Sequence, residues 1–200
     1  MRIDDFSVPD TLASYGAQGM AKEYYSAELY AHVMRSWLFA EGFATLEHRD
    51  GVDCELLYVA AMLHDIGLVG AFDNVTLPYE DAGGHAAVAL AFGAGWSKTR
   101  CERLLDVVIR HNWDHVDPEF DMEGYLLETA TGLDVSGKRA DVLPRSFTAE
   151  VLERYPREGF GREFVGLVRS QSVRKPDSAA HRMMANGLER KLTRKHPLDS

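Results

Sequence analysis

The run Leu56–Leu63 is the feature that most constrains the fold of this chain. Its residues are all apolar or aromatic, and the run ends at His64-Asp65, which Ile66-Gly67 follows. Such a run predicts a buried helix that stops where the two polar side chains begin. An unpaired carboxylate buried there is costly, and a bound metal ion removes that cost. The sequence therefore predicts a helical core with a metal-binding site at its edge.

Apolar residues recur with helical spacing along nearly the whole chain, and no pair of alternating apolar runs flanks an Asn-Gly or Asp-Gly turn. This pattern predicts an all-α fold. We expect Gly42 to end the first helix, Asp53 to cap the second, Thr99 with Glu102 to cap the fourth, and Ser146 to cap the sixth. The loop 69–84 is expected to lie over the site. The expected helices cover 20–41, 53–65, 84–93, a segment from 99 to 111, 124–135, 146–155, 160–173 and 178–193.

The length and composition fit one domain. The chain has 200 residues, of which 46% are hydrophobic, and no apolar stretch reaches the roughly 20 residues that a membrane span needs. We therefore expect a single domain over 1–200, with a metal-binding core at about 25–140 and a helical extension at 146–195. The N-terminus shows no apolar secretion signal, so we expect no membrane association and a cytoplasmic location. Cys54 and Cys101 are interpreted as reduced core residues.

Charge is unevenly distributed along the chain. The net charge is −9, but residues 151–200 hold 11 Lys/Arg against 6 Asp/Glu, so residues 1–150 carry about −14. Such a surface repels a nucleic-acid backbone and argues against a nucleic-acid partner. The basic pairs of the tail are interpreted as a solvated helical face, with an acidic partner or a second copy of the chain as the alternative: Arg174-Lys175, Arg190-Lys191 and Arg194-Lys195.

Further polar side chains fall on apolar helical faces. His32 lies between Leu29 and Ser36, His111 follows the spacing of Val108, and Asp134 shares a face with residues 127 and 130. Two imidazoles and two carboxylates are a ligand set for a divalent metal, zinc or iron first and manganese also, with open positions for water. The competing interpretation of His32 is a buried core histidine whose hydrogen bonds are all formed. The competing interpretation of Asp134 is a cap acceptor at a helix end.

The order His32, His64-Asp65, His85, His111, Asp134 resembles the HD superfamily. The resemblance covers about residues 25–140 and implies an HD-domain bundle of about five core helices, to which the C-terminal helices are added. It implies that His32, His64, Asp65 and Asp134 hold a first metal ion. It also implies that His85 and His111 hold a second ion or line the substrate pocket.

Shorter motifs are similar to the cyanamide hydratase-like branch of that superfamily. The chain departs from the branch at two places, because Asn112-Trp113 follows His111 where Thr-Ser is usual, and Ala31 stands where an Asn often precedes the first ligand. We expect a reshaped pocket and do not carry cyanamide over as the substrate. The motifs are Pro9-Asp10-Thr11, His32-Val33-Met34-Arg35-Ser36, Leu63-His64-Asp65-Ile66-Gly67, Tyr79-Glu80 with Gly83-Gly84-His85, Gly132-Leu133-Asp134-Val135 and Tyr155-Pro156-Arg157.

Four residues are candidates for catalytic roles. His85 and His111 either bind metal or substrate, or hydrogen-bond a backbone carbonyl. Glu80 either orients a ligand histidine or is a solvated loop carboxylate. Arg35, one turn after His32, either holds an anionic group or forms a structural ion pair.

A metal held in this way lowers the pKa of water, so the preferred function is a hydrolase or hydratase acting on a small polar molecule. The resemblance suggests a nitrile-like group. A phosphohydrolase is the second hypothesis, for which the cations nearest the site are Arg35, Arg110, Lys138 and Arg139. The third hypothesis is a two-iron oxygenase that uses all six ligands, and the fourth is a non-enzymatic, metal-stabilised interaction module.

Overall fold

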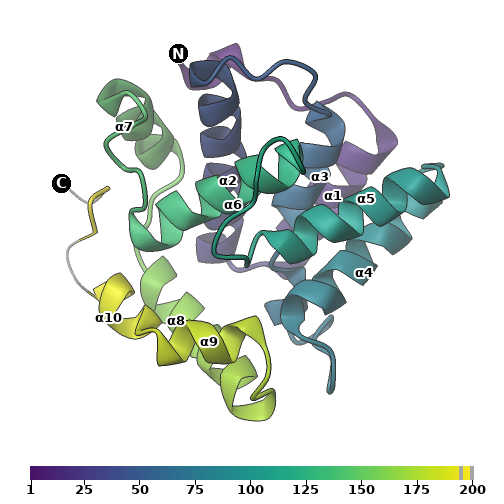
Figure 1. The fold of residues 1–200 in the computed structure, drawn as a ribbon, viewed down its shortest axis with the longest axis vertical. Helices are drawn as coiled ribbons and strands as arrows, with labels where there is room; N and C mark the ends of the chain where they lie inside the picture. The colour runs from purple at the N-terminus through teal and green to yellow at the C-terminus, as the bar shows by residue number, and fades with distance from the viewer. Residues whose placement is uncertain (194–195, 199–200) are drawn as a thin grey trace.

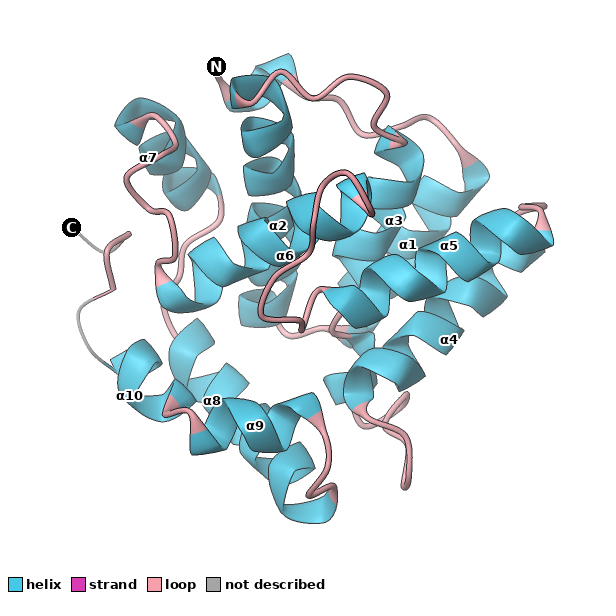
Figure 2. Ribbon diagram, viewed as in Figure 1, coloured by secondary structure: helices cyan, strands magenta, loops and turns pink. Residues whose placement is uncertain are grey.

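The computed structural model describes residues 1–193 and 196–198, and within them it contains helices and no strand. The all-α prediction is confirmed, and Figure 2 shows only helices and connecting loops in the described part of the chain. Short 3₁₀ turns lie at Ile3–Asp5 and Ile66–Leu68. The α-helices are α1 (Leu12–Tyr24), α2 (Ala27–Leu46), α3 (Cys54–Leu63), α4 (Tyr79–Gly93), α5 (Lys98–Arg110), α6 (Met122–Ser136), α7 (Arg145–Arg154), α8 (Phe160–Arg174), α9 (Ala179–Ala185) and α10 (Leu188–Thr193).

Helix α3 forms the centre of the bundle. It contacts α1, α2, α4, α5 and α6, and α2 also packs along α6. Every residue of Leu56–Leu63 is buried, so water is excluded from all sides of this part of the helix. Figure 1 shows α4 with α5 on one side of this core and α8 to α10 on the other. The predicted buried helix that ends at His64 is confirmed.

Polar side chains cap the starts of several helices, because each accepts a hydrogen bond from a backbone N–H in the first turn. Asp53 caps α3 as predicted. The cap of α5 is Ser97 and not Thr99, and α7 begins after Pro144 and not at Ser146. The capping side chains are Thr11, Ser26, Asp53, Ser97, Asp121 and Ser178.

The prediction of one helix over 20–41 is wrong. The segment holds the end of α1 and most of α2, which are separated by extended backbone at Tyr25 and Ser26. Gly42 does not end α2, because it lies inside the helix at a close approach to α7. A Cβ at Gly42 would lie 2.7 Å from the Phe147 ring. Gly42 is therefore a packing residue.

Helix α4 begins at Tyr79 and not at Gly84, with Pro78 at its N-cap. The chain just after His64-Asp65 packs directly on this first turn. A Cβ at Gly67 would lie 2.1 Å from the Tyr79 carbonyl oxygen, so only glycine fits there. This contact fixes α4 against the end of α3.

The predicted helix over 178–193 is two helices. The break is at Asn186 and Gly187, whose φ of 77° belongs to the left-handed region that favours glycine. Helix α10 then contacts both α6 and α8. The basic pair Arg194-Lys195 lies outside the described residues.

The loop before α4 does not cover the site. Asp73 accepts hydrogen bonds from Gln171 and Lys175, so the loop is attached to α8. Its residues 79–84 are helical.

Both cysteines are free thiols, as predicted. Cys101 is buried, but Cys54 is exposed at the start of α3, so the prediction that both are core residues is wrong for Cys54. None of the described helices combines the length and the apolar composition that crossing a lipid bilayer requires.

Candidate metal centre

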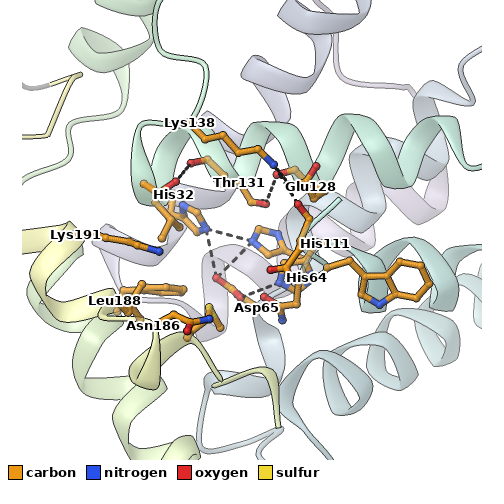
Figure 3. Close-up of a pocket in the computed structure, with 18 of the residues that line it drawn as sticks. His32, His64, Asp65, His111, Glu128, Thr131, Lys138, Asn186, Leu188 and Lys191 are labelled. Carbon is orange, nitrogen blue, oxygen red and sulfur yellow. Dashed lines mark hydrogen bonds and ion pairs between the residues drawn. The ribbon is translucent and has the colours of Figure 1, made fainter. Parts of the chain in front are cut away.

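The side chains of His32, His64 and Asp65 converge in the centre of the fold. His32 comes from the second turn of α2, and the other two follow the last turn of α3. One ligand atom of each lies within 4.8 Å of the others, and each residue is 1% exposed. Figure 3 shows the three groups facing one another at the wall of a pocket. We call these three residues the triad.

The distances within the triad are those of neighbouring ligands around one ion. The Nε2 atoms of His32 and His64 are 3.2 Å apart, and each lies 3.4 Å from Asp65 Oδ2. Ligand atoms that share a metal at about 2.0–2.2 Å have separations of this size. His111, at the end of α5, approaches from the other side, with its Nε2 3.8 Å from Asp65 Oδ1.

The hydrogen bonds of the three imidazoles decide where their protons lie. His64 Nδ1 is 2.8 Å from the carbonyl oxygen of Ala61, and His111 Nδ1 contacts that of Val108. A carbonyl oxygen only accepts, so both Nδ1 atoms donate. His32 Nδ1 likewise donates to Asp134, at 2.7 Å. When these rings are neutral, the Nε2 atom of each of the three histidines therefore carries the lone pair that can bind a metal ion.

Asp65 has no hydrogen-bond donor of its own among the described residues. Both of its carboxylate oxygens are buried and lack a hydrogen-bond partner. A carboxylate and several imidazole lone pairs facing one point repel each other unless a cation lies between them. The donor set of nitrogen and oxygen atoms fits a divalent transition metal such as zinc or iron.

The pKa values follow from burial and from the mutual contacts of these groups. Burial lowers the pKa of His111 to about 3, with His64 adding to the effect, so His111 is neutral at physiological pH. Burial also lowers the pKa of His32, but its hydrogen bond to Asp134 and the nearby negative charge of Asp65 outweigh burial and the pKa is raised. Burial raises the pKa of Asp65, yet the adjacent His64 and His32 lower it overall.

Asp134 lies behind His32 and not within the triad. Its Oδ2 contacts the Nδ1 atom of His32, whereas the Nε2 atom of that ring faces His64. A carboxylate in this position fixes the tautomer and orientation of a ligand histidine. Direct ligation by Asp134 stays a prediction.

Two arginines neutralise Asp134. Arg35, which is fully buried, donates from Nε at 2.8 Å and from Nη2 at 2.7 Å. Arg157 donates to Oδ1 at 2.7 Å. Arg35 also donates to the carbonyl oxygens of Tyr155 and Pro156. Of the two roles expected for Arg35, the structure therefore supports the structural ion pair.

These contacts predict how stability depends on acid. Burial raises the pKa of Asp134, but Arg35 and His32 hold it well below its usual value. Its contribution to the free energy of unfolding is therefore present above about pH 4 and is lost as pH falls toward the folded-state pKa. Urea unfolding of wild-type protein should show a marked loss of stability between pH 4 and pH 2, and Asp134→Asn should show a smaller loss over that interval. Glu153→Gln, at an exposed carboxylate of α7, is the control, and equal losses in all three proteins would contradict the assignment.

The structure does not bring His85 to the centre. His85 is exposed, because the inward face of α4 is formed by other positions, including Gly84 and Ala87. The expectation that His85 faces the site came from the resemblance to the HD superfamily, and the exposed side chain contradicts it. Glu80 is buried in the first turn of α4, and burial raises its pKa. It is not one of the described residues that line the pocket.

A pocket of about 390 Å³ opens onto the triad. Its far wall comes from α6, and α9 and α10 cover it, although the sequence predicted the loop 69–84 in that place. The described lining residues beyond the triad and His111 are Tyr79, Asn112, Trp113, Asp114, Glu128, Thr131, Gly132, Val135, Ser136, Lys138, Phe164, Met183, Asn186, Leu188 and Lys191.

Sequence reasoning missed several neighbours of the site. Phe160 of α8 stacks on the His32 ring, with ring centroids 4.5 Å apart. The Tyr79 hydroxyl is hydrogen-bonded to the Asn112 side chain. Trp113 lines the pocket and is 48% exposed. Asn112 and Trp113 stand where the chain departs from the branch it resembles, and that departure was the one sequence signal for them.

Comparison with known proteins found no matching protein-family model. Two curated proteins of Saccharomyces cerevisiae (strain ATCC 204508 / S288c) are similar to the chain, Cyanamide hydratase DDI2 and Cyanamide hydratase DDI3. Each is 27% identical to it over 164 residues, which cover 78% of this chain and 73% of the relative. The similarity supports a cyanamide hydratase-like relationship over most of the chain.

Proposed function

We propose that this chain is a metal-dependent hydro-lyase of HD type that adds water to a small polar molecule with a nitrile-like group. The observation that carries the proposal is the convergence of the His32 and His64 Nε2 lone pairs on the unpartnered carboxylate of Asp65. The similarity to two cyanamide hydratases supports an enzyme of the hydro-lyase class. A bound divalent metal supplies Lewis acidity and lowers the pKa of water to near neutrality.

The residues of the chain hold the ligand atoms in place. Asp134 keeps the proton of His32 on Nδ1, and its pairing with Arg35 and Arg157 keeps that carboxylate ionised. The Ala61 carbonyl does the same for His64. Both imidazoles are thereby fixed in the tautomer that leaves Nε2 free.

His111 supplies a neutral imidazole beside the triad. Because its pKa is about 3, its Nε2 atom accepts a hydrogen bond or a metal throughout the physiological range. Hydration of a nitrile-like group is balanced without a co-reactant, since the water oxygen bonds to carbon and both of its protons end on nitrogen. A buried acceptor beside the reacting water serves that proton transfer.

A phosphohydrolase and a two-iron oxygenase receive less support from the geometry. The cations expected to serve a phosphohydrolase are each paired with a carboxylate: Arg35 with Asp134, Arg110 with Asp121, Lys138 with Glu128 and Arg139 with Glu47. A two-iron oxygenase needs six ligands, and the exposed His85 is not near the other five.

The direct test is hydration of cyanamide to urea by metal-loaded protein, with simple nitriles as further substrates. We expect product that disappears after chelation and returns when zinc, iron or manganese is added. Metal-loaded protein that hydrates none of these molecules but hydrolyses p-nitrophenyl phosphate would contradict the proposal and favour a phosphohydrolase.

His111 and His85 are expected to differ sharply when each is replaced by alanine. His111→Ala should lower kcat by about 10²-fold, within the range typical of a lost general acid or base, while the triad still binds metal. His85→Ala is the matched control and should retain nearly the wild-type rate, because its side chain is in solvent. Steady-state kinetics with metal analysis distinguishes them, and a larger loss in His85→Ala than in His111→Ala would reverse these assignments.

A further inference from the structure

The pocket is much larger than cyanamide requires. Cyanamide has three non-hydrogen atoms, and a water-sized group uses about 10–15 Å³ of cavity volume of this kind. Such a molecule would occupy on the order of a tenth of the roughly 390 Å³ available. The remaining space lies under α9 and α10, so a second part of the substrate fits there.

One cation faces this space without a carboxylate partner among the described residues. Lys191 of α10 lines the pocket, and Figure 3 shows its amine directed toward the side where His32 lies. The other lining lysine, Lys138, donates to Glu128 at 2.7 Å, so its charge is already matched. Among the described residues, Lys191 forms no ion pair with a carboxylate.

The turn between α9 and α10 places this lysine. The left-handed backbone at Gly187 separates α10 from α9, and the Lys191 backbone N–H bonds to the Gly187 carbonyl in the first turn of α10. Leu188 is buried at the same turn and anchors α10. Asn186, also in the lining, presents a side-chain amide to the same pocket.

The acidic groups of the pocket do not cancel this charge. The Asp65 carboxylate faces the metal position, and Glu128 is matched by Lys138. Asp114 is exposed at the rim. A substrate anion near Lys191 thus meets an ammonium group, and the amide of Asn186 lines the same pocket.

We propose that the substrate carries an oxyanion group, a carboxylate or a phosphate, which Lys191 and Asn186 bind while the nitrile-like end lies at the triad. This inference rests on the proposed hydro-lyase function and names its substrate class. Lys191 is then a specificity-determining residue.

A matched pair of substrates tests it. Metal-loaded protein is assayed with 3-cyanopropanoate and with its neutral counterpart 3-cyanopropanamide, and cyanamide is the reference. We expect the carboxylate to have the lower KM. Lys191→Met should raise the KM for the carboxylate by roughly 5- to 10-fold, a range discounted for the exposed position of the ammonium group, and should leave kcat and the KM for the amide unchanged. Lys191→Arg keeps the positive charge, so it should retain most of the low KM for the carboxylate.

The neighbouring exposed residue supplies the control. Arg190→Met removes the same charge from α10, but Arg190 does not line the pocket, so it should not change the ratio of the two KM values. An arm with cyanomethylphosphonate identifies the oxyanion: tighter binding than the carboxylate assigns phosphate, and weaker binding assigns carboxylate.

The outcomes separate the two proposals. Normal cyanamide hydration with equal KM values for the carboxylate and amide, unchanged by Lys191→Met, would overturn the oxyanion inference and leave the hydro-lyase function standing. Calorimetry measures the binding of 3-cyanopropanoate to the wild-type and Lys191→Met proteins. Binding that depends on Lys191, without hydration of any substrate, would support the oxyanion site and contradict the hydro-lyase function.

Discussion

Replacing Asp65 with alanine is expected to remove the bound metal and to lower the hydration rate by at least about 10³-fold. Without a metal the pKa of water returns from near neutrality to far above it, so very little nucleophile exists at neutral pH. Asp65 is the one carboxylate of the triad, and its two oxygens have no hydrogen-bond partner among the described residues. The measurements are kcat/KM for cyanamide and metal content per chain.

The control for this variant is Asp114→Ala. Asp114 lines the same pocket but is exposed at its rim, so this variant should retain metal and the rate with neutral cyanamide. Circular dichroism of both proteins checks that the fold is intact. A folded Asp65→Ala protein with wild-type metal content and rate would contradict the assignment.

Replacing Arg35 with methionine is expected to be the most destabilising substitution on this side of the site. Arg35 is fully buried and holds Asp134 by two hydrogen bonds of 2.7 and 2.8 Å. Breaking a buried pair costs about 3–5 kcal/mol, and in this variant Arg157 is the one arginine of the described residues that still contacts Asp134. For a domain of this size, that corresponds to a fall in Tm on the order of 10 °C.

Arg139→Met is the matched control for the loss of a charged pair. Arg139 also contacts a carboxylate, Glu47, at 2.7 Å, but its side chain is 31% exposed. A pair so accessible to water is worth at most about 1 kcal/mol. Thermal unfolding of the two variants should therefore differ clearly, and equal shifts in Tm would show that Asp134 does not depend on Arg35.

The part of the site that local sequence patterns determine could be predicted. The apolar run Leu56–Leu63 could only be a buried helix, so His64 and Asp65 had to lie at the edge of the core. Helical spacing likewise directed His32 and His111 inward, and all four residues are buried.

The part that depends on contacts between distant segments could not be predicted. The face of α4 that turns inward, and with it the outward direction of His85, depends on how α4 packs against the segment after α3, where Gly67 closely approaches Tyr79. The position of Asp134 behind His32 depends on Arg157, which lies beyond α7. The placing of Lys191 depends on a turn at Gly187 that a helical pattern does not reveal.

The central claim is that imidazoles of the triad hold a divalent metal, and X-ray absorption spectroscopy of the purified protein tests it most directly. We expect at least one metal per chain, with scattering from two or three imidazole rings that decreases in His64→Ala. A protein that binds no divalent metal at micromolar concentrations, or binds one without imidazole scattering, would contradict this claim.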